Sequence, residues 1–212
     1  KFIIPRIAGV ENQLVFMAQS LQKNVWNSLG ETKKKNLLNI ISNKIPIMKN
    51  NAGIMISNFD SVYKYSQLYL EAFQNCEIYS NWEAYGDVYR YTKPSQDFIN
   101  STFKNKDTIW AFTYDIFNYI YNNPWTLSLR GKRILIISSF IESYKEKIDI
   151  RKEIYGIDLF PNCEFVFLKG PQTNGSNPSK EFYVELDSFT RKIYEIKDDF
   201  DVALVSCGGY GN

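Results

Sequence analysis

Short, largely apolar runs alternate with amphipathic stretches along the C-terminal half of the chain. The runs cover residues 134–137, 163–168 and 202–205, and the stretches between them cover residues 142–155 and 182–196. A short apolar run bounded by turn residues is typical of a strand that is buried on both faces, and helical spacing of apolar residues indicates an amphipathic helix. Strands that alternate with helices form parallel sheets with right-handed crossovers. The pattern therefore predicts a parallel α/β sheet.

The N-terminal half shows helical patterns and few strands. Apolar residues recur at helical spacing over residues 12–28 and 31–44, and a third helix follows the potential N-caps at residues 57–60. Short strands are expected at residues 1–5 and 76–82. The predicted fold class for the whole chain is α/β: a Rossmann-like, mostly parallel sheet flanked by helices, with a helix-rich N-terminal half.

The remaining segments have weaker patterns. Pro46 and residues 50–53 indicate a loop, whereas residues 87–108 are polar and give no assignment. Residues 109–112 favour a short strand and residues 115–121 a short aromatic helix. We expect residues 1–212 to form one domain, and a chain that begins with lysine rather than methionine is expected to be a fragment of a longer, multidomain protein.

Composition excludes several kinds of chemistry. The sequence has no histidine, which excludes Ser-His-Asp and Cys-His mechanisms and removes the commonest transition-metal ligand. Its three cysteines lie far apart and form no zinc or disulfide pattern, so we expect a reducing, cytoplasmic location. The net charge of +2 is too small to indicate nucleic-acid binding. No apolar run approaches the roughly 20 residues of a transmembrane helix.

Three strand ends of the predicted sheet carry polar or glycine-rich residues. In a parallel sheet these ends lie along one edge, where ligands of open α/β proteins bind. Hydroxyls, a lysine, an amide side chain and glycine N–H groups together suit an anionic ligand such as a pyrophosphate, although each segment alone can be a plain loop. A Walker loop and a complete G-x-G-x-x-G are both absent, so ATPases and ordinary dinucleotide oxidoreductases are disfavoured. The candidate phosphate-binding residues are Ser139, Lys169, Gln172, Thr173, Gly208, Gly209, Tyr210 and Gly211.

Asn123-Pro124-Trp125 is followed by the pattern L-x-G-K-x-I-L-I-I over residues 129–137. These motifs resemble the NPW and L-x-G-K-x-V-L-V-I signature of the GT-D fold-like glycosyltransferase family of polysaccharide-synthesis proteins. Further similarity covers Arg151-Lys152, Phe160-Pro161, Gln172-Thr173, residues 200–204, the closing glycine cluster and, more weakly, residues 50–53. The resemblance implies a domain that takes a sugar from a nucleotide-sugar donor and transfers it to a glycan or another hydroxyl acceptor.

The resemblance also implies roles for N-terminal residues. Related proteins carry an Arg-x-Gly-Asp-Gly-Glu stretch whose acidic pair helps to hold a divalent metal and the donor. Arg6 and Glu11 match this stretch here, but Gly9 stands where the aspartate is expected. Magnesium or manganese would therefore have Glu11 as its protein ligand. Arg6 and Asn51 are assigned to donor binding on the same grounds.

Sugar transfer requires a group that stabilises the leaving diphosphate and a base that deprotonates the acceptor. Lys169, the amides of residues 208–211 and Arg6 suit the first task. Glu11 is the main candidate base and Asp87 a second one, while a salt bridge with Arg6 is the structural alternative for Glu11.

Three tryptophans, Trp82, Trp110 and Trp125, are candidates for stacking on a base or a sugar, with core packing preferred for each. A second hypothesis is a non-catalytic relative that binds nucleotide-sugars, or acts as a scaffold, after losing the aspartate of the metal motif. A different enzyme, such as a methyltransferase with a nucleotide-like cofactor, stays open on grounds of fold.

Overall fold

The computed structural model describes residues 2–81, 86–114, 123–173 and 180–211. The chain divides into two compact units. Unit 1 contains the chain up to Phe112 together with Thr173–Val184, and unit 2 contains Thr113–Gln172 together with Glu185–Gly211. Each unit is α/β and is described by itself; the expectation of one domain over residues 1–212 stays a prediction.

Unit 1 is built mainly from helices. Helix α1 packs against α3, α4 and α5. Helix α4 begins where the side chain of Asn58 accepts a hydrogen bond from the Ser61 backbone N–H at 2.9 Å, as the N-cap prediction requires. The helical segments are α1 (Gly9–Ala18), α2 (Lys23–Ser28), α3 (Glu31–Ile47), a π-helical turn (Met48–Ala52), α4 (Phe59–Gln74) and α5 (Gly86–Thr102).

The core of unit 1 is rich in aromatic side chains. Leu14 and Val15 of α1 are fully buried, and the rings of Tyr69 and Phe73 on α4 stack with centroids 4.9 Å apart. The Phe73 ring also meets the edge of Tyr79 on the first strand. These contacts bury the apolar faces that helical periodicity predicted for α1 and α4.

A small parallel sheet lies in unit 1. Strands β1 (Ile78–Asn81) and β2 (Asp107–Trp110) pair in register, with Asn81 opposite Trp110. The N-terminal segment joins β1 through a single bridge between Arg6 and Ser80, flanked by backbone hydrogen bonds of 2.8 and 2.9 Å. The strand predicted at residues 1–5 is therefore reduced to this one bridge.

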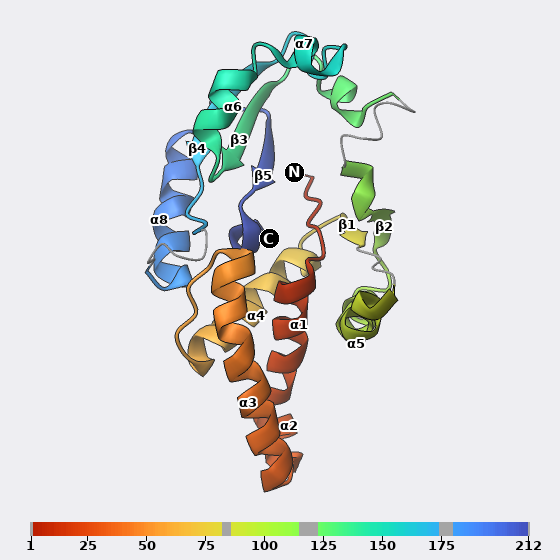
Figure 1. The fold of residues 1–212 in the computed structure, drawn as a ribbon, viewed down its shortest axis with the longest axis vertical. Helices are drawn as coiled ribbons and strands as arrows, with labels where there is room; N and C mark the ends of the chain where they lie inside the picture. Colours follow the sequence, from red (N-terminus) through yellow and green to blue (C-terminus); the bar gives the residue numbers. More distant parts are fainter. Residues whose placement is uncertain (1, 82–85, 115–122, 174–179, 212) are drawn as a thin grey trace. The chain divides into compact units, whose positions relative to one another are not determined.

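Unit 2 contains a three-stranded parallel sheet in the order β4–β3–β5 (Figure 1). Its strands are β3 (Arg133–Ser138), β4 (Glu164–Lys169) and β5 (Val202–Ser206). Helices α6 (Ile141–Lys147) and α7 (Arg151–Tyr155) connect β3 to β4, and α8 (Phe182–Glu195) precedes β5. The predicted alternation of strands and helices and the parallel pairing are both confirmed.

Burial differs among the three strands. The central strand β3 is buried from Ile134 to Ser138, as its apolar run predicted. Strand β5 lies at the edge, and Val205 is 46% exposed, so the expectation that this strand is buried on both faces is wrong. A continuous apolar run cannot by itself distinguish a central strand from an edge strand, because the pairing partners lie far away in the sequence.

One face of this sheet packs against α6. Ile134 and Ile136 of β3 form a buried cluster with Ile141 of α6. Leu129, Ile148, Phe160, Cys163, Phe165, Phe167 and Leu204 pack around this cluster. Because alternate residues of a strand share a face, Ser138, Lys169 and Ser206 continue the same face at the carboxyl ends of the strands.

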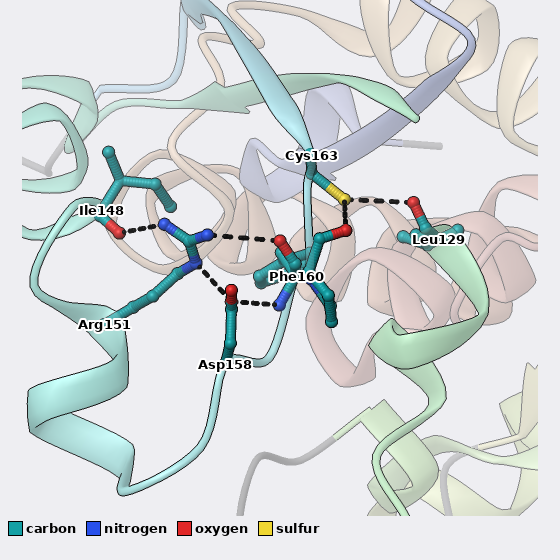
Figure 2. A network of polar contacts seen from close by, with 7 residues as sticks. Leu129, Ile148, Arg151, Asp158, Phe160 and Cys163 are labelled. Atoms are coloured by element: carbon teal, nitrogen blue, oxygen red, sulfur yellow. Dashed lines mark hydrogen bonds and ion pairs between the residues drawn. The ribbon is translucent and has the colours of Figure 1, made fainter. Parts of the chain in front are cut away.

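The loop between α7 and β4 is held by a polar network around Arg151 (Figure 2). The guanidinium donates to Asp158 Oδ1 at 2.9 Å, to the Ile148 carbonyl at 2.7 Å and to the Phe160 carbonyl at 3.2 Å. Asp158 Oδ1 also accepts from the Phe160 N–H at 3.1 Å. Arg151 thus ties the end of α6 to two points of this loop and helps to fix the entry of the chain into β4.

The Cys163 thiol forms a second contact in the same loop. It donates toward the Leu129 carbonyl at 3.0 Å and lies 3.6 Å from the Pro161 carbonyl (Figure 2). Asn162 adopts a left-handed φ of 56°, which asparagine tolerates better than most residues. The three cysteines are all free thiols.

Several element boundaries differ from those predicted. The helix expected over residues 12–28 breaks into α1, a 3-10 turn and α2, and the helix expected over residues 142–155 divides into α6 and α7. Pro46 lies inside α3 near its C-terminal end, and residues 50–52 lie in the π-helical turn rather than in a loop. Helix α5 occupies most of the polar segment that gave no assignment. The aromatic helix expected at residues 115–121 lies outside the described residues.

Candidate functional site

The carboxyl edge of the β4–β3–β5 sheet brings together residues from all three strand ends. Lys169 pairs in register with Ser138, and Ser138 pairs with Ser206 on its other side. Partners in parallel strands point to the same face, so an ammonium group lies in one row with two hydroxyl groups. Lys169 and Ser206 are exposed, whereas Ser138 is buried. This row can supply a positive charge and hydroxyl donors to an anion at the sheet edge.

Backbone and side chain of Ser138 shape the turn that follows β3. Its hydroxyl oxygen accepts a hydrogen bond from the Phe140 N–H at 3.1 Å, and its carbonyl accepts from the Gly170 N–H at 3.2 Å. The neighbouring Ser139 Oγ is buried and has no hydrogen-bond partner in the described part of the chain. A buried hydroxyl without a partner is costly, so Ser139 is a candidate contact for a ligand or a water.

Gly170 packs directly against Cys207 at the same edge. A Cβ atom added at Gly170 would lie 2.3 Å from Cys207 Sγ, 3.4 Å from Cys207 Cβ and 3.5 Å from Ile137 Cγ2. Glycine is therefore required by close packing, since its φ is not in the left-handed region. Burial raises the pKa of the Cys207 thiol, and the raised pKa keeps the thiol protonated. A hydrogen bond with the Gln172 backbone N–H lowers the pKa, but by less than burial raises it.

The glycine cluster after β5 forms a compact 3-10 turn over Gly208–Tyr210. Gly208 has a φ of 51°, in the region that favours glycine. The Tyr210 N–H donates to the Cys207 carbonyl at 3.1 Å and the Gly211 N–H donates to the Gly208 carbonyl at 2.9 Å. Because these two amides donate within the turn, Lys169 and the serine hydroxyls are better candidates than they are for contacts with an anion.

Two further predicted donor-binding residues belong to unit 1. Thr173 donates to the Gly53 carbonyl through its N–H at 2.8 Å and its hydroxyl at 3.1 Å. Asn51 is exposed in the π-helical turn that ends at Gly53, whose φ is 68°. Thr173 thus ties its own segment to this turn of unit 1.

Glu11 lies in the first turn of α1 and is 7% exposed. Burial raises the pKa of its carboxyl group, while the backbone N–H groups of Glu11 and Val10 and the charge of Arg6 oppose that rise. Burial together with the charge of Glu11 raises the pKa of the Tyr69 phenol. Glu11 therefore sits in a low-dielectric site at a helix N-terminus, with Arg6 and the Tyr69 hydroxyl close to it.

The surroundings of Glu11 do not fit a divalent metal. A helix N-terminus and the positive charge of Arg6 surround a single carboxylate, and both disfavour a second positive charge. Across the described residues, no group of three or more His, Cys, Asp or Glu side chains could hold a metal ion. The expected magnesium or manganese stays a prediction. Asp87, the second candidate base, lies in the first turn of α5.

The predicted stacking residues have different environments. Trp110 is 48% exposed and Trp125 is 37% exposed, so the core-packing interpretation is wrong for Trp110 and holds only in part for Trp125. The Trp125 ring meets the Tyr114 ring edge-on with centroids 5.9 Å apart. Trp82 lies outside the described residues.

Sequence reasoning missed some residues that the structure brings to these sites. Ser206 was not singled out because it is the last residue of its strand rather than part of the loop after it, and Ser138 was seen only as part of the strand end Ser138-Ser139-Phe140. Register alone places them beside Lys169. Tyr69 was interpreted as a core residue, and nothing in its sequence neighbourhood indicates that the charge of Glu11 acts on its phenol.

Comparisons of the chain with protein-family models, with curated proteins and with solved structures gave no match. No helix in the described ranges is both long enough and apolar enough to cross a membrane.

Proposed function

We propose that this chain is a nucleotide-sugar-dependent glycosyltransferase domain whose donor diphosphate binds at the carboxyl edge of the β4–β3–β5 sheet. The observation that supports this most strongly is the row formed by Lys169, Ser138 and Ser206. It lies where ligands bind in open parallel sheets, at the ends of adjacent parallel strands. The resemblance of the C-terminal motifs to glycosyltransferases supplies the choice of nucleotide-sugar among possible anionic ligands. In this proposal the unit 2 sheet belongs to a Rossmann-like fold.

Leaving-group stabilisation is the task of the row at the sheet edge. When a sugar leaves its donor, negative charge accumulates on the diphosphate, and a fixed ammonium group with hydroxyl donors stabilises that charge. Lys169 supplies the positive charge, and the Ser138 and Ser206 hydroxyls supply neutral donors. Packing between Gly170 and Cys207 holds the segments that follow β4 and β5 against each other, so the row needs little rearrangement when the ligand binds.

Glu11 is the proposed base. Burial raises the pKa of its carboxyl group, which makes the ionised form a stronger base than an exposed glutamate. Arg6 and the N–H groups of α1 favour the ionised form and so keep it available. The chemistry assigned to these residues needs no step through a metal ion.

Thermal unfolding with nucleotides tests the proposal. Uridine, guanosine and thymidine diphosphates are added separately, and at least one is expected to raise the Tm. A ligand at one hundred times its Kd stabilises by about 2.7 kcal/mol. Lys169→Ala removes a charged contact worth about 1.5–3 kcal/mol, so the Kd should rise roughly tenfold or more.

Lys132→Ala is the matched control, because Lys132 is exposed and precedes β3 at the opposite end of the same sheet. It should bind like the wild type. Absence of a Tm shift with every nucleoside diphosphate and nucleotide-sugar would refute the proposal.

A non-catalytic nucleotide-sugar-binding relative is the alternative, and Gly9 in place of the expected aspartate favours it. Release of nucleoside diphosphate from a nucleotide-sugar, measured with an acceptor panel, distinguishes the two. Binding without turnover supports the alternative, whereas turnover by the wild-type chain excludes it.

A further inference from the structure

Unit 1 has a depression of its own at the carboxyl end of the β1–β2 sheet. Its volume is about 280 Å³, and the described residues that line it are Asn81, Thr108, Ile109 and Trp110. Carboxyl ends of parallel strands are the usual place for ligands in α/β proteins. None of these residues belongs to the proposed phosphate site in unit 2.

Strand register brings three side chains of this depression to one face. Asn81 pairs with Trp110, and Thr108 lies two residues before Trp110 on the same strand. Residues opposite each other in register, and residues two apart along a strand, point to the same side of a sheet. An amide, a hydroxyl and an indole ring therefore share one surface, while Ile109 faces the other way.

Two observations indicate that this surface is suited to a ligand. The indole of Trp110 is 48% exposed, and the Phe112 ring lies beside it with centroids 4.9 Å apart, which restricts its orientation. Asn81 Oδ1 is buried and has no hydrogen-bond partner in the described part of the chain. An exposed, oriented aromatic face next to a side-chain amide and a hydroxyl group is an arrangement that suits a hydroxylated ring.

Size and charge narrow the ligand class. Pockets for drug-sized ligands have volumes of about 300–1,000 Å³, so a depression of about 280 Å³ suits one ring rather than a whole nucleotide-sugar. The four lining residues carry no formal charge, which gives no counter-charge to a phosphate. A sugar ring presents C–H groups to an aromatic face and hydroxyl groups to amide and hydroxyl partners.

We propose that the depression lined by Asn81, Thr108 and Trp110 binds a single neutral pyranose ring. The ring lies on the Trp110 indole, one sugar hydroxyl accepts from Asn81 Nδ2, and another bonds with the Thr108 hydroxyl. This inference does not depend on the proposed function, because its residues lie in unit 1 and its ligand carries no phosphate.

NMR titration of the ¹⁵N-labelled chain tests the site. Neutral monosaccharides, among them glucose, galactose, mannose and N-acetylglucosamine, are added up to tens of millimolar. At least one should shift the Trp110 indole N–H resonance, assigned through its loss in Trp110→Phe, together with the amides of Thr108 and Ile109. A nucleoside such as uridine is titrated in parallel and should leave these resonances unchanged.

Variants separate a ligand contact from a structural effect. Trp110→Ala should weaken saccharide binding by about tenfold or more, whereas Trp110→Phe keeps an aromatic face and should lose less. Trp125→Ala is the matched control in unit 2 and should bind like the wild type. Asn81→Ala gives a second test that leaves the aromatic face in place.

Three results would overturn the proposal: no monosaccharide shifts these resonances, Trp110→Ala binds as the wild type does, or uridine shifts them and the sugars do not. A uridine response would assign the surface to a nucleobase instead. Saccharide binding that persists in Lys169→Ala, while nucleotide binding is lost there, would show that the two sites are independent.

Discussion

The contact between Gly170 and Cys207 can be tested by adding one methyl group. In Gly170→Ala the new Cβ would lie 2.3 Å from Cys207 Sγ, well inside van der Waals contact. Cys207 is 1% exposed, so its sulfur cannot swing into solvent. Forcing an extra methyl group into a packed site typically costs about 1–3 kcal/mol. We therefore expect Gly170→Ala to lower the free energy of unfolding by about that amount.

Removing the sulfur should relieve the clash. With Cys207→Ala the nearest atoms to the new methyl group are the residue 207 Cβ at 3.4 Å and Ile137 Cγ2 at 3.5 Å, which are ordinary contacts. The double variant should therefore be more stable than the sum of the two single changes predicts. Contacting residues show coupling of about 0.5–3 kcal/mol in such cycles, and this pair should be in the upper half of that range.

Thermal unfolding of the four proteins measures the cycle. For chains of 150–250 residues, 1 kcal/mol shifts the Tm by roughly 2–4 °C. Gly9→Ala is the matched control, because Gly9 lies inside the first turn of α1 and a Cβ there meets nothing within 4 Å. A Gly170→Ala variant as stable as the wild type, or a strictly additive cycle, would show that the segments that follow β4 and β5 are not packed as described.

Two further predictions concern Arg151 and Glu11. Arg151→Lys keeps the charge but cannot bind Asp158 and two carbonyls together, so it should destabilise by about 1–3 kcal/mol in thermal unfolding. The control Arg191→Lys, in an exposed pair with Asp187, should change stability by less than about 0.5 kcal/mol. The raised pKa of Glu11 means that wild-type stability falls as pH rises above 4.5 through the folded-state pKa. Glu11→Gln removes that loss, so the Tm of the variant should exceed the Tm of the wild type at pH 7.5 but not at pH 4. An equal Tm difference at both pH values would contradict burial as the cause of the raised pKa of Glu11.

The sequence predicted the unit 2 sheet well because its signals are local. Each of its strands is a short apolar run between turn residues, and α8 has the predicted inward side with Phe189 buried. The parallel pairing followed from alternation with helices and is confirmed. The exposure of β5 could not be predicted, because an edge position depends on which strands pair and not on the strand's own residues.

Unit 1 was harder to predict for physical reasons. Helix α5 contains Pro94 and many polar residues, and its buried side sets the polar residues Thr92, Ser95 and Gln96 beside the fully buried Ile99, which leaves a weak apolar period in the sequence. The segment between α1 and α2 contains no proline or glycine, so the sequence does not indicate that the helix breaks there. The environment of Glu11 depends on Tyr69, which lies far along the chain.

The most direct test of the account maps nucleotide binding onto the unit 2 sheet. Amide resonances of the ¹⁵N-labelled chain are followed while the nucleoside diphosphate with the largest thermal shift is added. The account predicts shifts concentrated at Ser139, Gly170 and Gly208, which disappear in Lys169→Ala and persist in Lys132→Ala. Shifts confined to other residues, or equal in Lys169→Ala and the wild type, would contradict a diphosphate site at this edge.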